Sequence, residues 1–194
     1  LGKAFAYPAK LTSCLLVSEG HGAAPVYFLA QELRSRGKRV DMVVGGETMD
    51  RVFKPIEGKR LSQTIAIMTA DGSLGEQGNV LDALPGMLEA TGAQVVYAAG
   101  RRSTLRSIAD LCVERRIPSQ MAVEEHMGCG MGMCFTCTVP VIRKDGSGYD
   151  NLRACTDGPV FNPARILWDR WMGDEPRMTP TPPEGFEVVR TWPG

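Results

Sequence analysis

Four of the six cysteines lie close together in the sequence, and their spacing constrains this chain more than any other feature. In the order C-x4-C-x2-C-x17-C they are Cys129, Cys134, Cys137 and Cys155. This is the spacing of the ligands of a plant-type [2Fe–2S] cluster. Alternate positions from 128 to 132 are glycine, which suits a loop that bends sharply and turns backbone N–H groups toward sulfur. We therefore predict that the four cysteines hold a [2Fe–2S] cluster.

Two other interpretations of the cluster are open at this point. Structural zinc would use four thiolates, but zinc sites usually combine two C-x2-4-C knuckles, and here the fourth cysteine stands alone. Unligated thiols are the remaining possibility. His126 is predicted to be a loop residue, because four cysteines already complete a ligand set. The isolated Cys14 and Cys112 lie in apolar segments and are predicted to be small buried residues.

Charge and composition exclude several classes of protein. The chain has 194 residues, 43% of them apolar, with 22 basic and 22 acidic side chains. A nucleic-acid-binding protein would show a basic excess. No run approaches the 18 apolar residues of a membrane span, and the first residues do not form a signal peptide. Clustered cysteines without a secretory signal favour a metal site over a disulfide scaffold.

Strand-like and helix-like patterns alternate along the first two thirds of the chain. Apolar runs predict strands, and 3.6-residue periodicity with glycine or proline stops predicts helices. The predicted strands are 12–18, 40–44, 64–68, 94–98 and 121–123, and the predicted helices are 25–36, 79–90 and 101–116. This alternation predicts an α/β domain with a parallel sheet over residues 11–124.

The composition changes after residue 124. Residues 125–171 are rich in glycine and cysteine and are predicted to form a small, irregular, β-rich cluster domain. Its hairpin is predicted to turn at 144–148. Residues 172–194 are proline-rich and are predicted to be a tail that is either extended or docked only through Phe186 and Trp192. Residues 1–10 are predicted to be a linker.

Three segments resemble one known family. They are residues 124–137 (EEHMGCGMGMCFTC), 153–161 (RACTDGPVF) and 69–75 (TADGSLG). Together they resemble motifs of the electron-transfer subunit of dihydroorotate dehydrogenase B. The resemblance extends from residue 1 to about residue 170, and the cysteine motif is its most specific part.

The resemblance implies a ferredoxin-reductase-like fold of three parts: an FAD-binding β-barrel, an NAD-binding α/β domain and a [2Fe–2S] domain. Residues 1–8 resemble the end of the barrel, so we expect this chain to be a fragment, a processed form or a natural truncation. The dinucleotide would lie at the carboxyl ends of the strands. The residues implied for that site are Gly20, Gly22, Thr69, Asp71, Gly72 and Ser73.

The implied function is electron transfer in the cytoplasm. Electrons would pass from NADH through FAD and the cluster to a catalytic dihydroorotate dehydrogenase-like flavoprotein subunit, in pyrimidine biosynthesis. No side chain is a convincing acid–base or nucleophilic catalyst, which fits a relay whose chemistry belongs to cofactors. The chain would be a component of an oxidoreductase that is not self-sufficient without the FAD domain and a partner. Two alternatives stay open: a non-catalytic adaptor with a degenerate NAD site, and a subunit of a hydrogenase or a ferredoxin:NAD oxidoreductase.

Two departures from the family pattern concern NAD(H) binding. The glycine-rich turn of the family begins here with Ser18 and Glu19, and a carboxylate near a diphosphate repels it unless it points away. The family's later CGP turn has Ala99 in place of cysteine. Arg101 and Arg102 would compensate if they bound phosphate at a helix N-terminus, although arginines at such positions are more often solvated.

Overall fold

The computed structural model describes residues 1–172. The predicted tail, with Phe186 and Trp192, lies outside the described residues except for its first residue. No helix among residues 1–172 is long and apolar enough to cross a membrane.

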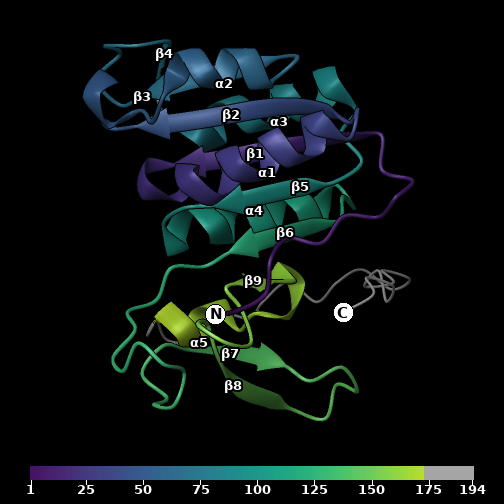
Figure 1. The fold of residues 1–194 in the computed structure, drawn as a ribbon, viewed down its shortest axis with the longest axis vertical. Coiled ribbons are helices and arrows are strands. Elements are labelled where there is room, and N and C mark those ends of the chain that lie inside the picture. Colours follow the sequence, from purple (N-terminus) through teal and green to yellow (C-terminus); the bar gives the residue numbers. More distant parts are fainter. Residues whose placement is uncertain (173–194) are drawn as a thin grey trace.

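The larger part of the molecule is built on one seven-stranded sheet in the order β4-β3-β2-β1-β5-β6-β9 (Figure 1). All neighbouring strands are parallel except the last pair, β6 and β9. The chain runs from β1 outward through β2 and β3, then returns to the other side of β1 for β5 and β6. The strands are β1 (Ser13–Glu19), β2 (Arg39–Gly46), β3 (Ile65–Thr69), β4 (Glu76–Gln77), β5 (Val96–Ala99), β6 (Ser119–Ala122) and β9 (Val160–Phe161).

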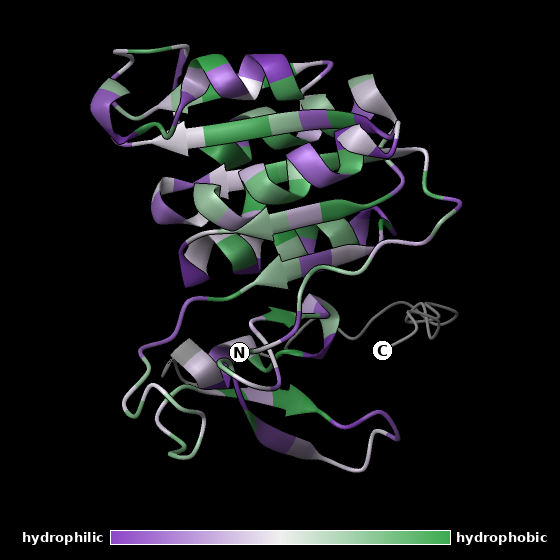
Figure 2. Ribbon diagram, in the orientation of Figure 1, coloured by the Kyte–Doolittle hydropathy of each residue, from purple (hydrophilic) through white to green (hydrophobic). Residues whose placement is uncertain are grey.

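Helices cover both faces of this sheet. On one face α1 (Ala23–Ser35) and α2 (Pro55–Leu61) pack on the strands, and on the other α3 (Val80–Thr91) and α4 (Arg102–Glu114) do so. Each face has its own apolar cluster, and the central strands are buried on both sides. Figure 2 shows the apolar residues gathered along these strands. A parallel sheet covered on both faces is the expected consequence of βαβ crossovers.

The predicted elements agree with the structure to within about three residues at each end, and the predicted α/β fold is confirmed. Gly37 ends the first helix with a positive φ of 70°, and Gly92 caps α3 in the left-handed conformation. Four α-helices and β-strands of residues 1–172 were not predicted: α2, β4, β9 and α5 (Trp168–Met172). Each has seven residues or fewer, which is too short for a clear hydrophobic period.

The cysteine-bearing part follows β6. Its hairpin pairs β7 (Thr138–Ile142) with β8 (Tyr149–Arg153), and the connection lies at the predicted position. The chain then returns to the large sheet as β9, antiparallel to β6. Apolar side chains of this part, including Phe161, Trp168 and Trp171, share one buried cluster with Leu105 of α4. The boundary predicted at residue 124 therefore does not separate two independent cores.

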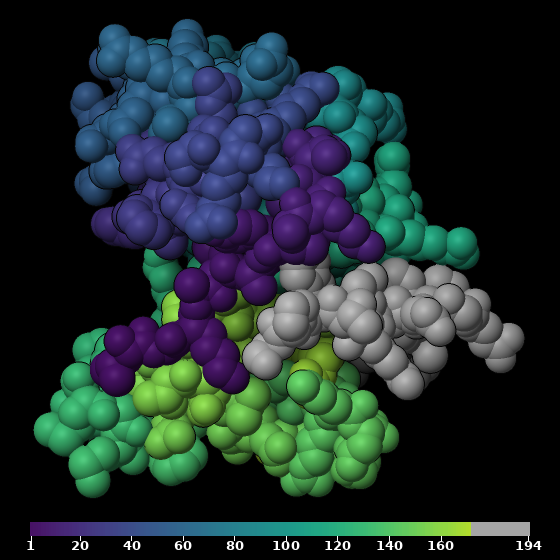
Figure 3. Space-filling model, turned by 45° about the vertical axis from the view of Figure 1, so that its right-hand side comes forward, coloured from purple at the N-terminus to yellow at the C-terminus, as the bar shows by residue number. Residues whose placement is uncertain are grey.

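Polar contacts also join the two parts. Arg106 of α4 forms a partly buried ion pair with Asp169 of α5 (2.6 Å). The N-terminal segment lies across the same junction (Figure 3). There Lys3 N–H donates to the Gly158 carbonyl (2.5 Å), and Ala6 exchanges two hydrogen bonds with the Gln120 side chain. The segment predicted to be a linker is thus bonded to both parts.

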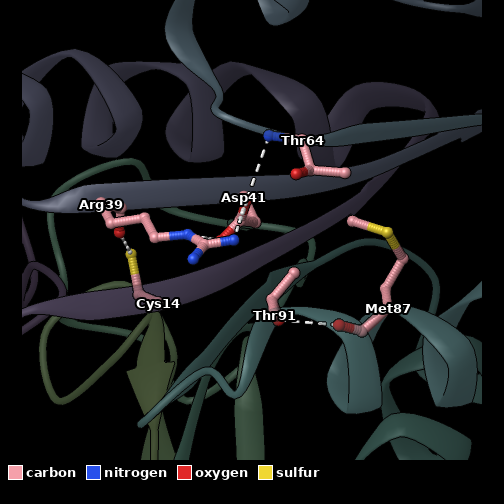
Figure 4. Close-up of polar contacts among 6 residues, drawn as sticks. All are labelled: Cys14, Arg39, Asp41, Thr64, Met87 and Thr91. Atoms are coloured by element: carbon pink, nitrogen blue, oxygen red, sulfur yellow. Dashed lines mark hydrogen bonds and ion pairs between the residues drawn. The ribbon is translucent and has the colours of Figure 1, made fainter.

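One charged group buried in the sheet, the Asp41 carboxylate, is satisfied by nearby donors (Figure 4). Asp41 is fully buried in β2, where it pairs with Arg39 (2.8 Å) and accepts the Thr64 N–H (3.0 Å). Cys14 and Cys112 are buried, as predicted. Burial raises the pKa of each of these two thiols to about 12, so both remain protonated and unreactive at neutral pH.

Candidate iron–sulfur site and adjoining cleft

The hairpin places two of the predicted ligands side by side. Cys137 directly precedes β7, and Cys155 follows β8 by two residues. The ladder continues past the strands, because Ala154 N–H donates to the Cys137 carbonyl (2.7 Å). Both cysteines are buried. The 17 residues between them therefore form the hairpin that brings the fourth cysteine back to the third.

The other two ligands form a second pair in the loop before β7. The Cys129 sulfur accepts the N–H groups of Met133 (3.3 Å) and Cys134 (3.4 Å). The N–H of Cys134, followed by that of Met131 and the Cys134 thiol, lowers the pKa of Cys129 to about 6. This loop therefore favours the thiolate that binds metal.

The pKa of Cys155 moves the opposite way. Its hydrogen bond with the Cys137 thiol is the largest cause of the rise, followed by burial and by the charges of Cys137 and Cys129. Like charges near one another raise a thiol pKa unless a cation is present. A metal cation at this place would remove that penalty. The donor set thus fits a metal centre.

The arrangement consists of two pairs: Cys129 accepts the Cys134 N–H, and the backbone bond from Ala154 to Cys137 brings Cys155 beside Cys137. Among residues 1–172, no group of three or more Cys, His, Asp or Glu side chains is gathered as ligands of one metal ion. A [2Fe–2S] cluster is held by four thiolates that are shared between two irons. The two pairs match that division of ligands.

The glycines of the loop serve different purposes. Gly130 and Gly132 have positive φ, 70° and 81°, as the sequence predicted. Gly128 instead allows a close approach: an added Cβ would lie 2.8 Å from the Thr136 hydroxyl oxygen and 3.4 Å from the Cys134 sulfur. His126 is an exposed loop residue, as predicted.

Arg153 joins the two cysteine-bearing segments and was not singled out from the sequence. Its guanidinium donates to the Gly132 carbonyl (2.8 Å) and lies over the Phe135 ring at 4.9 Å. Its backbone N–H donates to Asp157 (3.0 Å), just after the last cysteine. The only sequence signal was an arginine two residues before Cys155, which by itself does not reveal these contacts.

Apolar side chains surround the cysteine loop on the outside. Among the large apolar residues that are exposed, four come from this loop: Met127, Met131, Met133 and Phe135. Met131, Met133 and Phe135 are each more than 60% exposed. Exposed apolar groups concentrated in one short segment mark a surface that is suited to contact another protein.

A second candidate site lies at the carboxyl ends of β1, β2 and β5. It is a cleft of about 500 Å³, placed where the sheet order reverses beside β1. In α/β sheets this is the usual position of a ligand. The lining residues are Glu19, Gly20, His21, Ala24, Gly46, Glu47, Asp50, Arg51, Phe53, Gly100, Arg101 and Glu124.

The structure distributes the predicted nucleotide residues unevenly. Gly20 lines the cleft. Gly22 is buried behind it, where an added Cβ would lie 2.2 Å from the Ala99 carbonyl oxygen, so this glycine allows α1 to pack on β5. The Thr69–Ser73 turn does not line the cleft, as far as the structure describes it (residues 1–172).

That turn bonds mainly to itself. Asp71 accepts both the N–H and the hydroxyl of Ser73, and Ser73 in turn accepts the N–H of Met49 (2.8 Å), next to the cleft-lining Asp50. Thr69 donates its hydroxyl to the Leu74 carbonyl (2.8 Å). The turn therefore supports the rim of the cleft, and a direct role of its residues in binding stays a prediction.

The two arginines considered for phosphate binding have different surroundings. Arg101 lines the cleft and pairs with Glu47 across its mouth (2.7 Å). Arg102 pairs with Glu125 and lies over the Trp171 ring at 4.5 Å. Arg102 is therefore engaged with the cysteine-bearing part instead of the cleft.

Comparison with known proteins agrees with the assignment of the cysteine loop. Residues 124–167 match the family model described as the iron–sulfur cluster binding domain of dihydroorotate dehydrogenase B. Curated relatives named dihydroorotate dehydrogenase B (NAD(+)), electron transfer subunit, match most of this chain. The one from Desulforamulus reducens is 29% identical over 87% of the chain, and the one from Bacillus caldolyticus is 37% identical over 79%. The chain spans 64% and 56% of their respective lengths.

Solved structures show the same architecture. The chain is similar to a chain of the NADH-dependent reduced ferredoxin-NADP oxidoreductase, with a TM-score of 0.67 and 27% identity. That match covers 87% of this chain and 59% of the other. The C-terminal domain of the PF1911 hydrogenase from Pyrococcus furiosus shares the fold, with a TM-score of 0.50 at 16% identity. The family resemblance seen in the sequence motifs is thus confirmed.

Proposed function

Because residues 124–167 belong to the family of iron–sulfur cluster binding domains of dihydroorotate dehydrogenase B, we propose that this chain is an electron-transfer component of an NAD-linked flavin and iron–sulfur oxidoreductase. The observation that carries this proposal is the pairing of Cys129 with Cys134 and of Cys137 with Cys155 by backbone hydrogen bonds of the loop and the hairpin. We assign these four residues as ligands of a [2Fe–2S] cluster, which supplies one-electron chemistry when bound.

Residues of this chain would hold the cluster and influence the relative stability of its oxidised and reduced forms. Backbone N–H groups that already point at the Cys129 sulfur would donate to a charged cluster and stabilise its more reduced form. Burial of Cys137 and Cys155 would keep water from one side of the cluster, whereas Cys129 and Cys134, on the other side, are partly exposed. The exposed side is the side from which an electron would enter or leave.

The cleft beside β1 is the proposed NAD(H) site. Its place at the sheet reversal and the position of Gly20 in its lining support this assignment. Gly22 would maintain its floor, and Thr69, Asp71, Gly72 and Ser73 would support its rim. FAD would be bound in the longer proteins of the family, by the β-barrel that the family resemblance implies.

The proposed partner is the catalytic subunit of a dihydroorotate dehydrogenase, a flavoprotein, in pyrimidine biosynthesis. The relatives are named electron transfer subunits, and electron transfer requires a second protein close to the cluster. The exposed Met127, Met131, Met133 and Phe135 would form the contact, since methionine adapts to a partner surface and phenylalanine contributes buried area. None of the six cysteines forms a disulfide, and four are the proposed cluster ligands, which suits a reducing compartment, so we place the protein in the cytoplasm.

A second candidate is supported by the structural comparison. The similarity to the NADH-dependent reduced ferredoxin-NADP oxidoreductase suits a subunit that exchanges electrons with a ferredoxin system instead of dihydroorotate dehydrogenase. Both candidates use the same cluster. Pull-down with a dihydroorotate dehydrogenase catalytic subunit and with a ferredoxin separates them, and Met133→Asp should weaken whichever complex forms.

The cluster assignment is tested by metal analysis of protein purified without oxygen. We expect two irons and two acid-labile sulfides per chain, with the visible absorption of an iron–sulfur protein. Serine in place of any one of the four ligand cysteines should lower the iron content severely. Cys112→Ala, which changes a buried cysteine elsewhere, should retain it. A colourless, zinc-loaded protein would refute the assignment.

A further inference from the structure

Glu19 extends from the last position of β1 toward the beginning of α4. Its carboxylate accepts the Thr104 hydroxyl hydrogen bond at 2.6 Å, and Thr104 is the third residue of that helix. It also adjoins the β5–α4 turn, since an added Cβ at Gly100 would lie 3.4 Å from the Cβ of Glu19. Glu19 is part of the cleft lining and is partly buried.

The N-terminus of α4 has no stabilising negative charge within the helix, and Glu19 supplies one. The N-cap residue Arg101 makes no side-chain capping bond, and the first turn of the helix has no acidic residue. The N-terminus of a helix carries partial positive charge and unpaired N–H groups, so it attracts anions. Glu19 supplies a negative charge to this place from another element.

The charges around Glu19 compensate its carboxylate only in part, because no cation forms an ion pair with it within residues 1–172. The other acidic residues of the lining are Glu47, Asp50 and Glu124, against the basic Arg51, Arg101 and His21. Arg101 interacts with the charge of Glu19, but its ion pair is with Glu47. Within residues 1–172, no arginine, lysine or histidine lies within ion-pair distance of the Glu19 carboxylate.

We infer that Glu19 is the specificity-determining residue of the cleft: it occupies the anion-binding end with the chain's own carboxylate and weakens binding of ligands that carry a diphosphate. This inference rests on the proposed NAD(H) site. A dinucleotide brings two negative charges to the carboxyl ends of the strands, where helix N-termini normally favour them. Here the Glu19 carboxylate already lies at the N-terminus of α4 and repels the diphosphate of an incoming ligand. Ligands without phosphate do not meet this repulsion.

The test is titration of the full chain with NADH, ADP-ribose and adenosine by calorimetry. Glu19→Gln removes the charge but keeps the shape and an oxygen that can accept from Thr104. It should tighten NADH and ADP-ribose binding about tenfold and change adenosine binding less than twofold. Glu19→Asp keeps the charge and should remain within about threefold of the original chain for all three ligands.

The matched control is Glu114→Gln, the same change of net charge at the opposite end of α4. It should leave all three affinities unchanged. Equal NADH affinity in Glu19→Gln and the original chain would overturn the inference, as would equal tightening of adenosine. Absence of saturable binding in every variant at millimolar ligand would also overturn it. Iron content of the same preparations reports separately on the cluster, so failure of this inference is distinguishable from failure of the proposed electron transfer.

Discussion

Alanine at Gly132 should disrupt the cysteine loop for two separate physical reasons. Gly132 has φ of 81°, which side-chain-bearing residues rarely adopt, and an added Cβ would lie 2.6 Å from Thr156 Cγ2. Thr156 directly follows Cys155, so this contact presses the first cysteine segment against the last. The substitution therefore strains the approach of the two segments that carry the proposed cluster ligands.

The magnitude follows from adding the two costs. A left-handed conformation costs an L-residue about 1–2 kcal/mol. Overpacking by one methyl group costs about 1–3 kcal/mol more. We expect Gly132→Ala to destabilise the protein by about 2–5 kcal/mol. The matched control is Gly130→Ala, since Gly130 has φ of 70° but no atom within 4 Å of an added Cβ. Its cost should be about 1–2 kcal/mol.

Urea unfolding followed by circular dichroism measures the stability, and iron retained per chain measures the integrity of the site. Thr156→Ser removes the methyl group that collides with the new Cβ. In the Thr156→Ser background, Gly132→Ala should cost no more than Gly130→Ala. If Gly132→Ala and Gly130→Ala were equally stable, or if the serine brought no recovery, the proposed contact between the two segments would be wrong.

Three further changes test other parts of the structure. Gly22→Ala places a Cβ against the carbonyl at the end of β5, so it should lower the free energy of unfolding by about 3 kcal/mol or more; a variant as stable in urea as the original would contradict this packing. Ser73→Ala removes the hydroxyl that is the largest cause of the low Asp71 pKa, so that pKa should rise toward its ordinary value in an NMR titration. Because the folded-state pKa is depressed, the stabilisation by the Asp71 carboxylate is present above its ordinary value of about 3.9 and is lost as pH falls below it, and Ser73→Ala should reduce this dependence. Trp171→Phe removes the indole donor to Glu125 (2.7 Å) and should lower stability by about 1–2 kcal/mol in thermal melts, whereas an unchanged melting temperature would show that the bond is dispensable.

The sequence by itself was sufficient for features that depend on local pattern. Strand and helix positions follow from periodicity and from stop residues such as Gly37 and Gly92, because these effects act within one turn or one strand. The spacing of Cys129, Cys134 and Cys137 is local in the same sense, and it pointed to a metal centre. The hairpin turn was predictable because glycine and aspartate favour its backbone conformation.

Only the tertiary structure decided which distant groups meet. Pairing of Cys137 with Cys155 depends on the register of the hairpin, and the contacts of Arg153 depend on where the loop folds back. Gly22 was assigned to the nucleotide site from its motif, yet the close approach of β5 is what requires glycine there. Likewise, a carboxylate at position 19 was visible in the sequence, but not its bond to Thr104 on α4. The physical reason is that such contacts join residues far apart in the chain, and their geometry is set by how helices and strands pack, which no local pattern records.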